Sequence, residues 1–369
     1  MRRALIYVSS SSVVFLASEY ITNPQQTPCP ARRKLSETMD PYKYLNIRLN
    51  PDGSLARNGE AKLLPPAPSG ELIAVTSAST DGPARRIVHS NDLPLDDAKG
   101  TSVRLFVPAG VDDGGSSTLP LILYFHGGGY VLFRAASEPF HNTAAVLAAT
   151  VPAAVASVDY RLAPEHRLPA AFDDAADAVR WVRSYAAGSP GRPVFIMGCH
   201  NGASIAFRAA LAAADQGVEL RGLILNQAHH SGVERTAAEN ASVDDRVLPL
   251  PANDLLWELA LPFAADRDHE YCNPETMLAG VSKARLRKLP PCLVLGRKKD
   301  PPRDRQRVLV AALREAGVDV EARMDGAGFH AMELFKPNCA AEFNAQVADF
   351  VRRHAGDHGV EVHAARSRL

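Results

Sequence analysis

Residues 194–206 constrain the fold more than any other part of the chain. An apolar run ends at Gly198, Gly202 follows four residues later, and an alanine-rich segment that favours a helix begins there. This order predicts a buried strand, a sharp turn and a helix. The turn has the spacing of a Gly-x-Ser-x-Gly nucleophile elbow, whose glycines let strand and helix approach closely while the central side chain stands above the sheet. The central residue of this elbow is His200, not serine.

Apolar runs and helical patterns alternate along most of the chain. This alternation predicts an α/β fold with a mostly parallel central sheet, helices on both of its faces, and ligands at the carboxyl ends of the strands. With 369 residues, 46% of them hydrophobic, the chain can bury one large core. The predicted strands are 103–107, 121–125, 153–158, 194–198, 221–227, 292–296 and 320–324, and the predicted helices are 169–182, 202–216, 304–316 and 339–353.

Two segments depart from this alternation and are expected to shape a pocket. Residues 39–68 mix aromatic residues, Pro and Gly without a period, which predicts an arm or cap. Residues 228–288 form polar loops around one helical stretch, which is typical of a lid insertion. The main domain is therefore predicted to span 39–353. Residues 1–38 are expected to be a disordered or dispensable extension, with a signal or transit peptide as the alternative, and 354–369 a polar tail.

Charge and cysteine usage narrow the classes of partner. Lys plus Arg and Asp plus Glu both number 41, so no net field attracts nucleic acid or an anionic membrane, and a small neutral or apolar ligand, such as an apolar metabolite, fits better. The five cysteines are scattered and form no Cys-x-x-Cys pair, which argues against a disulfide framework and a zinc site. We therefore expect no metal, no cofactor and a cytoplasmic protein; the pattern specifies no oligomeric state.

A glycine triplet follows the most apolar of the predicted strands. Leu121–Phe125 runs directly into His126, Gly127, Gly128 and Gly129. Three residues without Cβ let backbone N–H groups point at a bound oxyanion. A flexible turn is the alternative interpretation, but the buried strand before the triplet and the elbow downstream favour an oxyanion hole.

Three side chains follow three predicted strands in the order elbow, acid, histidine. They are His200, Asp300 and His330, which is the order along the chain of an α/β-hydrolase triad. Asp300 comes directly after its strand, whereas Asp304 fits better as an N-cap or surface partner of the next helix. The sequence therefore favours Asp300 as the acid, with Asp304 as the alternative.

Six short segments between residue 39 and about residue 353 form a recognisable set. They are Met-Asp-Pro-Tyr at 39–42, His-Gly-Gly-Gly-Tyr at 126–130, Asp-Tyr-Arg-Leu-Ala-Pro-Glu at 159–165, Asp-Arg-Asp-His-Glu-Tyr at 266–271, Asp-Arg-Gln at 304–306 and Gly-Phe-His at 328–330. With this set, the chain resembles plant carboxylesterases of the hormone-sensitive-lipase-like branch of the α/β hydrolases. The resemblance implies an oxyanion hole formed by backbone N–H groups of Gly127, Gly128, Gly129 and Asn201, with Asp300 as acid and His330 as general base.

The elbow departs from the family pattern. Gly-Asp-Ser-Ala-Gly becomes Gly-Cys-His-Asn-Gly at 198–202. An imidazole is bulkier than a hydroxyl and its acyl adduct is reactive, so serine-type turnover is expected to be lost or severely reduced. Cys199 is expected to point away from the elbow tip and Ser204 lies inside the helix, so neither is expected to replace the nucleophile.

Two kinds of function remain open at this point. The first is a carboxylesterase-like enzyme that acts on a small ester. The alternative is a non-hydrolytic binder or receptor, or a lyase or dehydratase that uses Asp300, His330 and the oxyanion hole. The resemblance implies this range, because family members with altered triads act as dehydratases, cyclases or hormone receptors.

Overall fold

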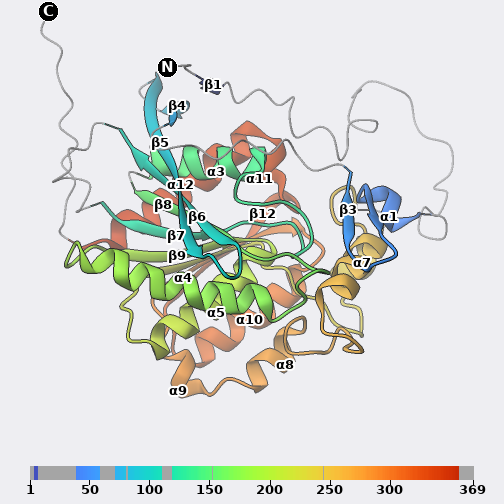
Figure 1. Cartoon of the computed structure of the whole chain (residues 1–369). Helices are drawn as coiled ribbons and strands as arrows, with labels where there is room; N and C mark the ends of the chain where they lie inside the picture. Colours follow the sequence, from blue (N-terminus) through green and yellow to red (C-terminus); the bar gives the residue numbers. More distant parts are fainter. Residues whose placement is uncertain are drawn as a thin grey trace, which may run out of the picture.

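A mixed ten-stranded sheet organises the computed structural model (Figure 1), which describes residues 4–6, 39–58, 71–79, 82–109, 119–151, 153–243 and 245–356. The strand order is β1-β4-β5-β6-β8-β7-β9-β10-β11-β12. The strands are β1 (Ala4–Ile6), β4 (Glu71–Ser79), β5 (Gly82–Asp96), β6 (Thr101–Pro108), β7 (Leu121–Phe125), β8 (Ala154–Asp159), β9 (Val194–Cys199), β10 (Gly222–Asn226), β11 (Cys292–Lys299) and β12 (Val320–Phe329).

The sheet is parallel in the part that carries the elbow. Strands β8, β7, β9, β10, β11 and β12 pair in parallel, whereas β4, β5, β6 and β8 pair in antiparallel fashion. All five residues of β7 are buried, as expected for a central strand covered on both faces. The carboxyl ends of β7, β9, β11 and β12 therefore meet at one edge of the sheet, where ligands bind in such folds.

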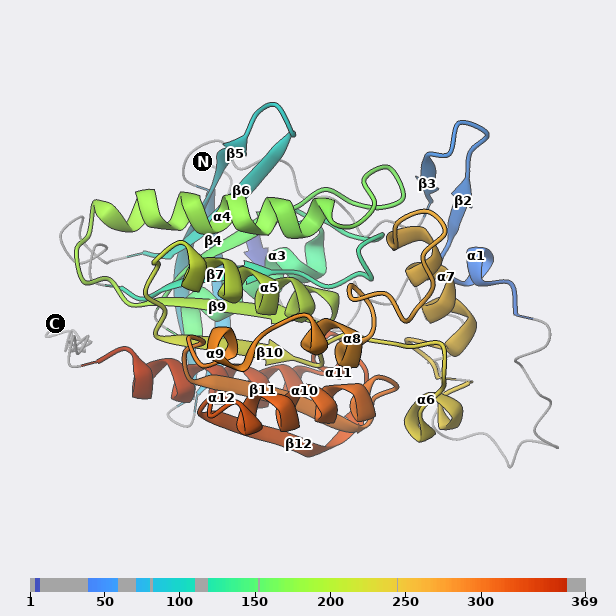
Figure 2. The ribbon, with the colours of Figure 1, turned by 90° about the horizontal axis from the view of Figure 1, so that it is seen from below.

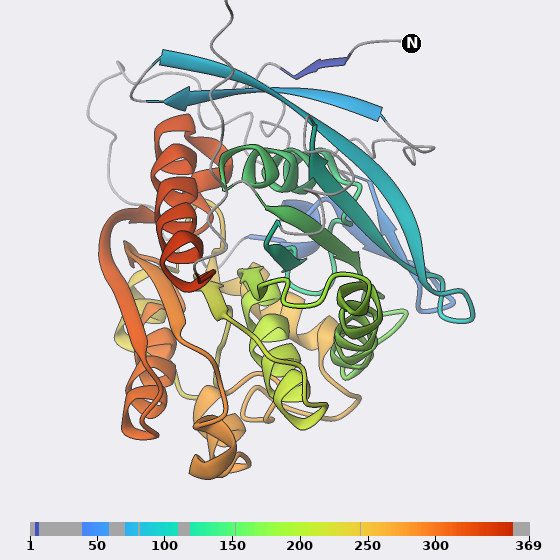
Figure 3. The ribbon, with the colours of Figure 1, turned by 90° about the vertical axis from the view of Figure 1, so that its left-hand side faces the viewer.

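Alternating side chains of the central strands pack against two helical layers. Leu121, Leu123 and Phe125 belong to the core formed with α4 (Ala170–Ala187), α5 (Asn201–Asp215) and α10 (Arg303–Glu315). Ile122 and Tyr124 belong to the opposite core, formed with α3 (Glu138–Thr150) and α12 (Pro337–His354). Figure 3 shows α3 and α12 on one side of the sheet and α4 and α5 on the other. Because successive side chains of a strand point to opposite faces of the sheet, each central strand contributes apolar residues to both cores.

The arm and helix α7 of the insertion lie side by side beyond one end of the sheet (Figures 1 and 2). The arm contains α1 (Pro41–Tyr44), β2 (Ile47–Leu49) and β3 (Leu55–Arg57). The insertion contains α6 (Ala237–Ala241), α7 (Leu250–Ala260), α8 (Pro274–Ala279) and α9 (Lys283–Leu286). The Tyr44 hydroxyl of the arm donates a hydrogen bond of 2.5 Å to the Arg246 carbonyl of the insertion. The two segments therefore meet directly.

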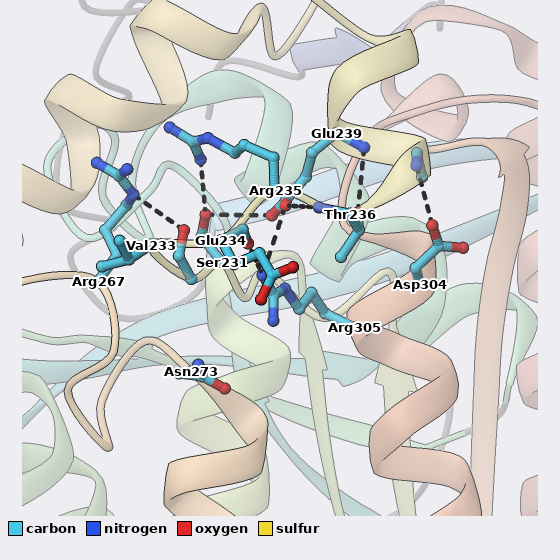
Figure 4. A network of polar contacts seen from close by, with 12 residues as sticks. Ser231, Val233, Glu234, Arg235, Thr236, Glu239, Arg267, Asn273, Asp304 and Arg305 are labelled. Carbon is cyan, nitrogen blue, oxygen red and sulfur yellow. Dashed lines mark hydrogen bonds and ion pairs between the residues drawn. The ribbon is translucent and has the colours of Figure 1, made fainter.

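A polar network fastens the insertion to α10 (Figure 4). The buried Arg305 of α10 donates to the Glu234 carbonyl and lies 3.6 Å from the Glu239 carboxylate. Asp304 lies in the first turn of α10, whose N-cap is Pro302, and accepts 2.9 Å from the backbone N–H of Ala238 in α6. Asp304 therefore binds the insertion rather than capping its own helix.

The chain termini bear on two sequence predictions. Of the predicted extension at 1–38, only Ala4–Ile6 is described, and it pairs in parallel with β4. Helix α12 ends at His354, so most of the predicted tail lies outside the described residues. Within the described segments, no helix has the length and apolar character needed to cross a membrane.

Candidate active site

The turn between β9 and α5 is built as the elbow spacing predicts. His200 adopts φ 59° and ψ −123°, a backbone conformation that only a tightly held turn imposes on a residue with a side chain. Its N–H donates 2.8 Å to the Asn226 carbonyl on β10. A Cβ on Gly198 would lie 1.9 Å from the Gly202 carbonyl oxygen, and one on Gly202 would lie 2.2 Å from the Phe125 carbonyl oxygen. Both glycines are therefore required by close backbone contacts.

The predicted acid and histidine are paired. His330 follows β12, and its Nδ1 donates 2.7 Å to Oδ1 of Asp300, which follows β11. The other carboxylate oxygen of Asp300 accepts 2.7 Å from Nε2 of Gln306, and only 1% of Asp300 is exposed. Burial lowers the pKa of His330, but the charge and hydrogen bond of Asp300 outweigh burial and raise this pKa overall. His330 is therefore the better proton carrier of the site.

The His200 ring lies against His330. Their ring centroids are 4.6 Å apart, and His200 is 4% exposed. Nε2 of His200 lies 3.2 Å from Oε1 of Glu333 but is not aligned with it for a hydrogen bond. Burial lowers the pKa of His200 despite the opposing effect of Glu333, so the ring is neutral near pH 7.

Glu333 is a site residue that sequence reasoning missed. It lies in α11 (Met332–Phe335), is 7% exposed, and accepts 2.6 Å from Nδ2 of Asn226 and 2.8 Å from Nε2 of Gln227. Burial raises its pKa, but the contacts with His200 and Asn226 dominate and lower it to about 2. The only signal was an acidic residue three positions after His330 in an otherwise apolar segment. The site therefore contains two histidine–carboxylate pairs.

The glycine triplet lies close against the elbow. A Cβ on Gly127 would lie 2.4 Å from Nδ1 of His200, so the imidazole covers this glycine. The N–H of Gly129 donates 2.8 Å to Oδ1 of Asn201. Among the four predicted oxyanion donors, Gly129 is thus engaged by a side chain, and Gly127 faces the imidazole. The N–H groups of Gly128 and Asn201 remain as candidate donors.

The side chains of Cys199 and Ser204 lie near the elbow but point away from its tip. Cys199 is buried, its sulfur lies 3.7 Å from Nδ2 of Asn226, and burial raises its pKa to about 12. The Ser204 hydroxyl donates 3.0 Å to the His229 carbonyl. Neither residue lines the pocket beside His200. The expectation that neither replaces the nucleophile agrees with these contacts.

A mostly apolar pocket opens onto the two histidines. Its wall combines the glycine loop, the arm, the insertion and α11, so segments far apart in the sequence shape one cavity. In the described part of the chain, no cluster of three His, Cys, Asp or Glu residues is placed to hold a metal ion. The lining residues are Tyr44, Leu45, Gly128, Gly129, Leu132, Phe133, Pro139, Phe140, His200, His229, Arg246, Val247, Leu248, Leu256, His330, Ala331, Leu334 and Phe335.

Comparison with known proteins identifies the family. A family model described as alpha/beta hydrolase fold matches residues 122–334. Probable carboxylesterase 8 of Arabidopsis thaliana is 39% identical over 330 residues, which cover 85% of this chain and 94% of that protein. The 3-O-acetylpapaveroxine carboxylesterase CXE1 of Papaver somniferum is 37% identical over 331 residues, covering 85% and 97%. The gibberellin receptor GID1 of Oryza sativa is 38% identical over 208 residues, covering 55% and 58%.

Solved structures agree with the family model. The ester-hydrolase EH1AB1 from the metagenome of Lake Arreo has a TM-score of 0.63 and 26% identity, covering 73% of this chain and 83% of that one. The chain belongs to the plant carboxylesterases of the hormone-sensitive-lipase-like α/β-hydrolase family. The predicted fold and the sequence resemblance are both confirmed.

Proposed function

We propose that this carboxylesterase-like α/β hydrolase binds a small ester or a related apolar metabolite, and that it has lost serine-type hydrolytic turnover. Hydrolysis by this family requires a hydroxyl at the elbow, deprotonated by the histidine and directed at an acyl carbon. An imidazole at this position brings no such hydroxyl. The pocket itself remains, with apolar walls and a few polar groups at its base.

The contacts of His200 are the observation that carries this proposal. Nε2 of His200 lies beside the Glu333 carboxylate, and Nδ1 lies against Gly127. The ring therefore fills the space between the glycine loop and His330, where a tetrahedral acyl adduct forms in a serine esterase. Neither ring nitrogen has a free path to an acyl carbon. The gibberellin receptor among the relatives supports a ligand-binding role for a pocket of this family.

The test measures turnover and binding on the same purified protein. We expect no hydrolysis of p-nitrophenyl acetate above the buffer rate. Across a panel of small esters and ketones, we expect at least one compound to raise the melting temperature, since a ligand at 100 times its dissociation constant adds about 2.7 kcal/mol of stability. Leu248→Trp fills the pocket and is expected to abolish this shift, whereas Phe263→Trp on the exposed surface preserves it.

Two results would contradict the proposal. One is hydrolysis by the unaltered chain that His330→Ala abolishes, because a working esterase site would then be present. The other is the absence of any stabilising compound, or a shift that Leu248→Trp leaves unchanged, because the pocket would then not be the binding site.

A second candidate is a lyase-type proton transfer, favoured by the intact His330–Asp300 pair. The bond of 2.7 Å and the raised pKa of His330 suit a group that carries a proton to or from a bound carbonyl compound. Mass spectrometry of the stabilising compounds after incubation distinguishes the candidates. A changed product mass that depends on His330 supports the lyase, and unchanged compounds support the binder.

A further inference from the structure

A second side chain of the elbow also acts against hydrolysis. Asn201 follows His200, at a position where the family pattern has alanine. Its carboxamide oxygen accepts 2.8 Å from the N–H of Gly129, one of the donors that the glycine loop offers to an oxyanion. The contact is fully buried, since Asn201 is 0% exposed. The amide that a substrate oxygen would need is thus already bound within the protein.

The orientation of the Asn201 carboxamide is determined at both ends. The Tyr160 hydroxyl donates 2.9 Å to the His126 carbonyl, so its oxygen is an acceptor toward Nδ2 of Asn201, 3.1 Å away. At the other end, the Gly129 N–H can pair only with an acceptor, which places Oδ1 there. A flip of the amide would set a donor against a donor at Gly129. The hydrogen-bond chain therefore excludes the flipped orientation.

Neighbouring groups pack closely against the glycine loop. A Cβ on Gly129 would lie 2.7 Å from a methyl group of Leu256, and one on Gly128 would lie 2.1 Å from the Leu132 carbonyl oxygen. Tyr160 is fully buried, and its ring stacks on His126 at a centroid distance of 4.3 Å. Packing thus keeps the Gly129 N–H and the Asn201 carboxamide in contact. A developing oxyanion would have to displace Oδ1 of Asn201 to reach the Gly129 N–H.

We propose that Asn201 is a positioning residue that closes the oxyanion site independently of His200. This inference rests on the proposed loss of hydrolysis and adds a second cause for it. Restoring serine at position 200 is then insufficient, because the tetrahedral intermediate still lacks the Gly129 donor. Loss of one oxyanion donor costs about 10²–10³-fold in kcat in enzymes of this kind.

The experiment compares His200→Ser with His200→Ser/Asn201→Ala in p-nitrophenyl acetate hydrolysis. We expect the double variant to have a kcat about 10²-fold higher with little change in KM, because the freed donor acts mainly on the transition state. His200→Ser/Ser204→Ala is the matched control. It removes a side-chain hydrogen bond one turn away in α5 without touching the glycine loop, and it should match His200→Ser. An equal or lower kcat for the Asn201 variant would overturn the inference.

A second measurement does not depend on turnover. In protein labelled with ¹⁵N-glycine, the Gly129 amide should be protected from hydrogen exchange in the unaltered chain and exchange faster in Asn201→Ala, with other core glycines unchanged. Equal exchange in the two proteins would refute the proposed bond. Hydrolysis by the unaltered chain would instead contradict the proposed function, and the ratio between the two serine variants would still report on Asn201.

Discussion

The two histidine–carboxylate pairs of the site contain similar groups but differ in geometry and charge. His330 donates an aligned bond of 2.7 Å to Asp300, whereas His200 lies 3.2 Å from Glu333 without alignment. The pKa of His330 is raised and that of His200 is lowered, although both rings are buried. A carboxylate beside an imidazole therefore does not by itself make a proton carrier. Whether the imidazole carries a proton depends on the alignment of its hydrogen bond to the carboxylate. It also depends on whether the charge of the carboxylate outweighs the effect of burial on the pKa.

The carboxylates explain part of this difference. Asp300 has one strong side-chain donor, Gln306, besides His330, so much of its charge acts on the imidazole. Glu333 also accepts hydrogen bonds from the amides of Asn226 and Gln227, so its charge is shared among three partners and acts less on His200. The first pair keeps the arrangement of a hydrolase, and the second holds a bulky ring in the place of the nucleophile.

The largest expected effect concerns the His330–Asp300 pair. In the His200→Ser/Asn201→Ala background, Asp300→Asn is expected to lower kcat by about 10⁴-fold, because the neutral amide no longer orients and stabilises the His330 imidazolium. Esterase kinetics measure this. Asp304→Asn is the control, because Asp304 binds the Ala238 amide rather than His330, and kcat should change little. A large loss in the control alone would place the acid at Asp304.

The next effect concerns the stability supplied by the second pair. Glu333→Ala leaves the amides of Asn226 and Gln227 buried without their acceptor, and it is expected to lower the free energy of unfolding by about 3–5 kcal/mol. Urea unfolding followed by circular dichroism measures the change. In the control Glu315→Ala, which removes an exposed ion pair with Lys283, the urea midpoint should not move. Equal midpoints for the two variants would show that Glu333 is not held by its partners.

The smallest expected effect is a dependence of stability on pH. The pKa of Glu333 is about 2 in the folded chain, below the ordinary value of 4.5. A lowered pKa stabilises the fold above the ordinary value, and this contribution of about 3 kcal/mol is lost as the pH falls from 4.5 toward 2. Unfolding measured across this window should be less steep in pH for Glu333→Gln. Parallel curves for the two proteins would show that Glu333 titrates normally.

Much of the fold was predictable because its strands are marked by local patterns. The runs at 121–125, 194–198 and 292–296 are apolar over their whole length, as central strands require. Helix α3 and strands β4 and β5 were not predicted. In β5, buried Val88 and Ser90 alternate with exposed Ile87 and His89, so polarity does not follow burial there and no apolar run marks the strand. Tertiary contacts decide the structure of such segments.

The candidate site was predictable to a similar degree. His200, Asp300 and His330 each follow a recognisable strand, and the structure brings them together as their order suggests. The sequence offered no means of finding Glu333 as a partner of His200, or the Asn201 carboxamide as a partner of Gly129. Both contacts join residues more than seventy positions apart, and neither lies at a characteristic spacing.

The sequence alone determined that a sharp bend joins β9 to α5 and that an imidazole stands at its tip. Glycine spacing and apolar periodicity act over a few residues, so they can be recognised without the rest of the chain. Only the tertiary structure decided what that imidazole and the neighbouring carboxamide contact. Hydrogen bonds of 2.6–3.1 Å depend on how β10, α11 and the glycine loop pack together, and packing is a property of the whole core.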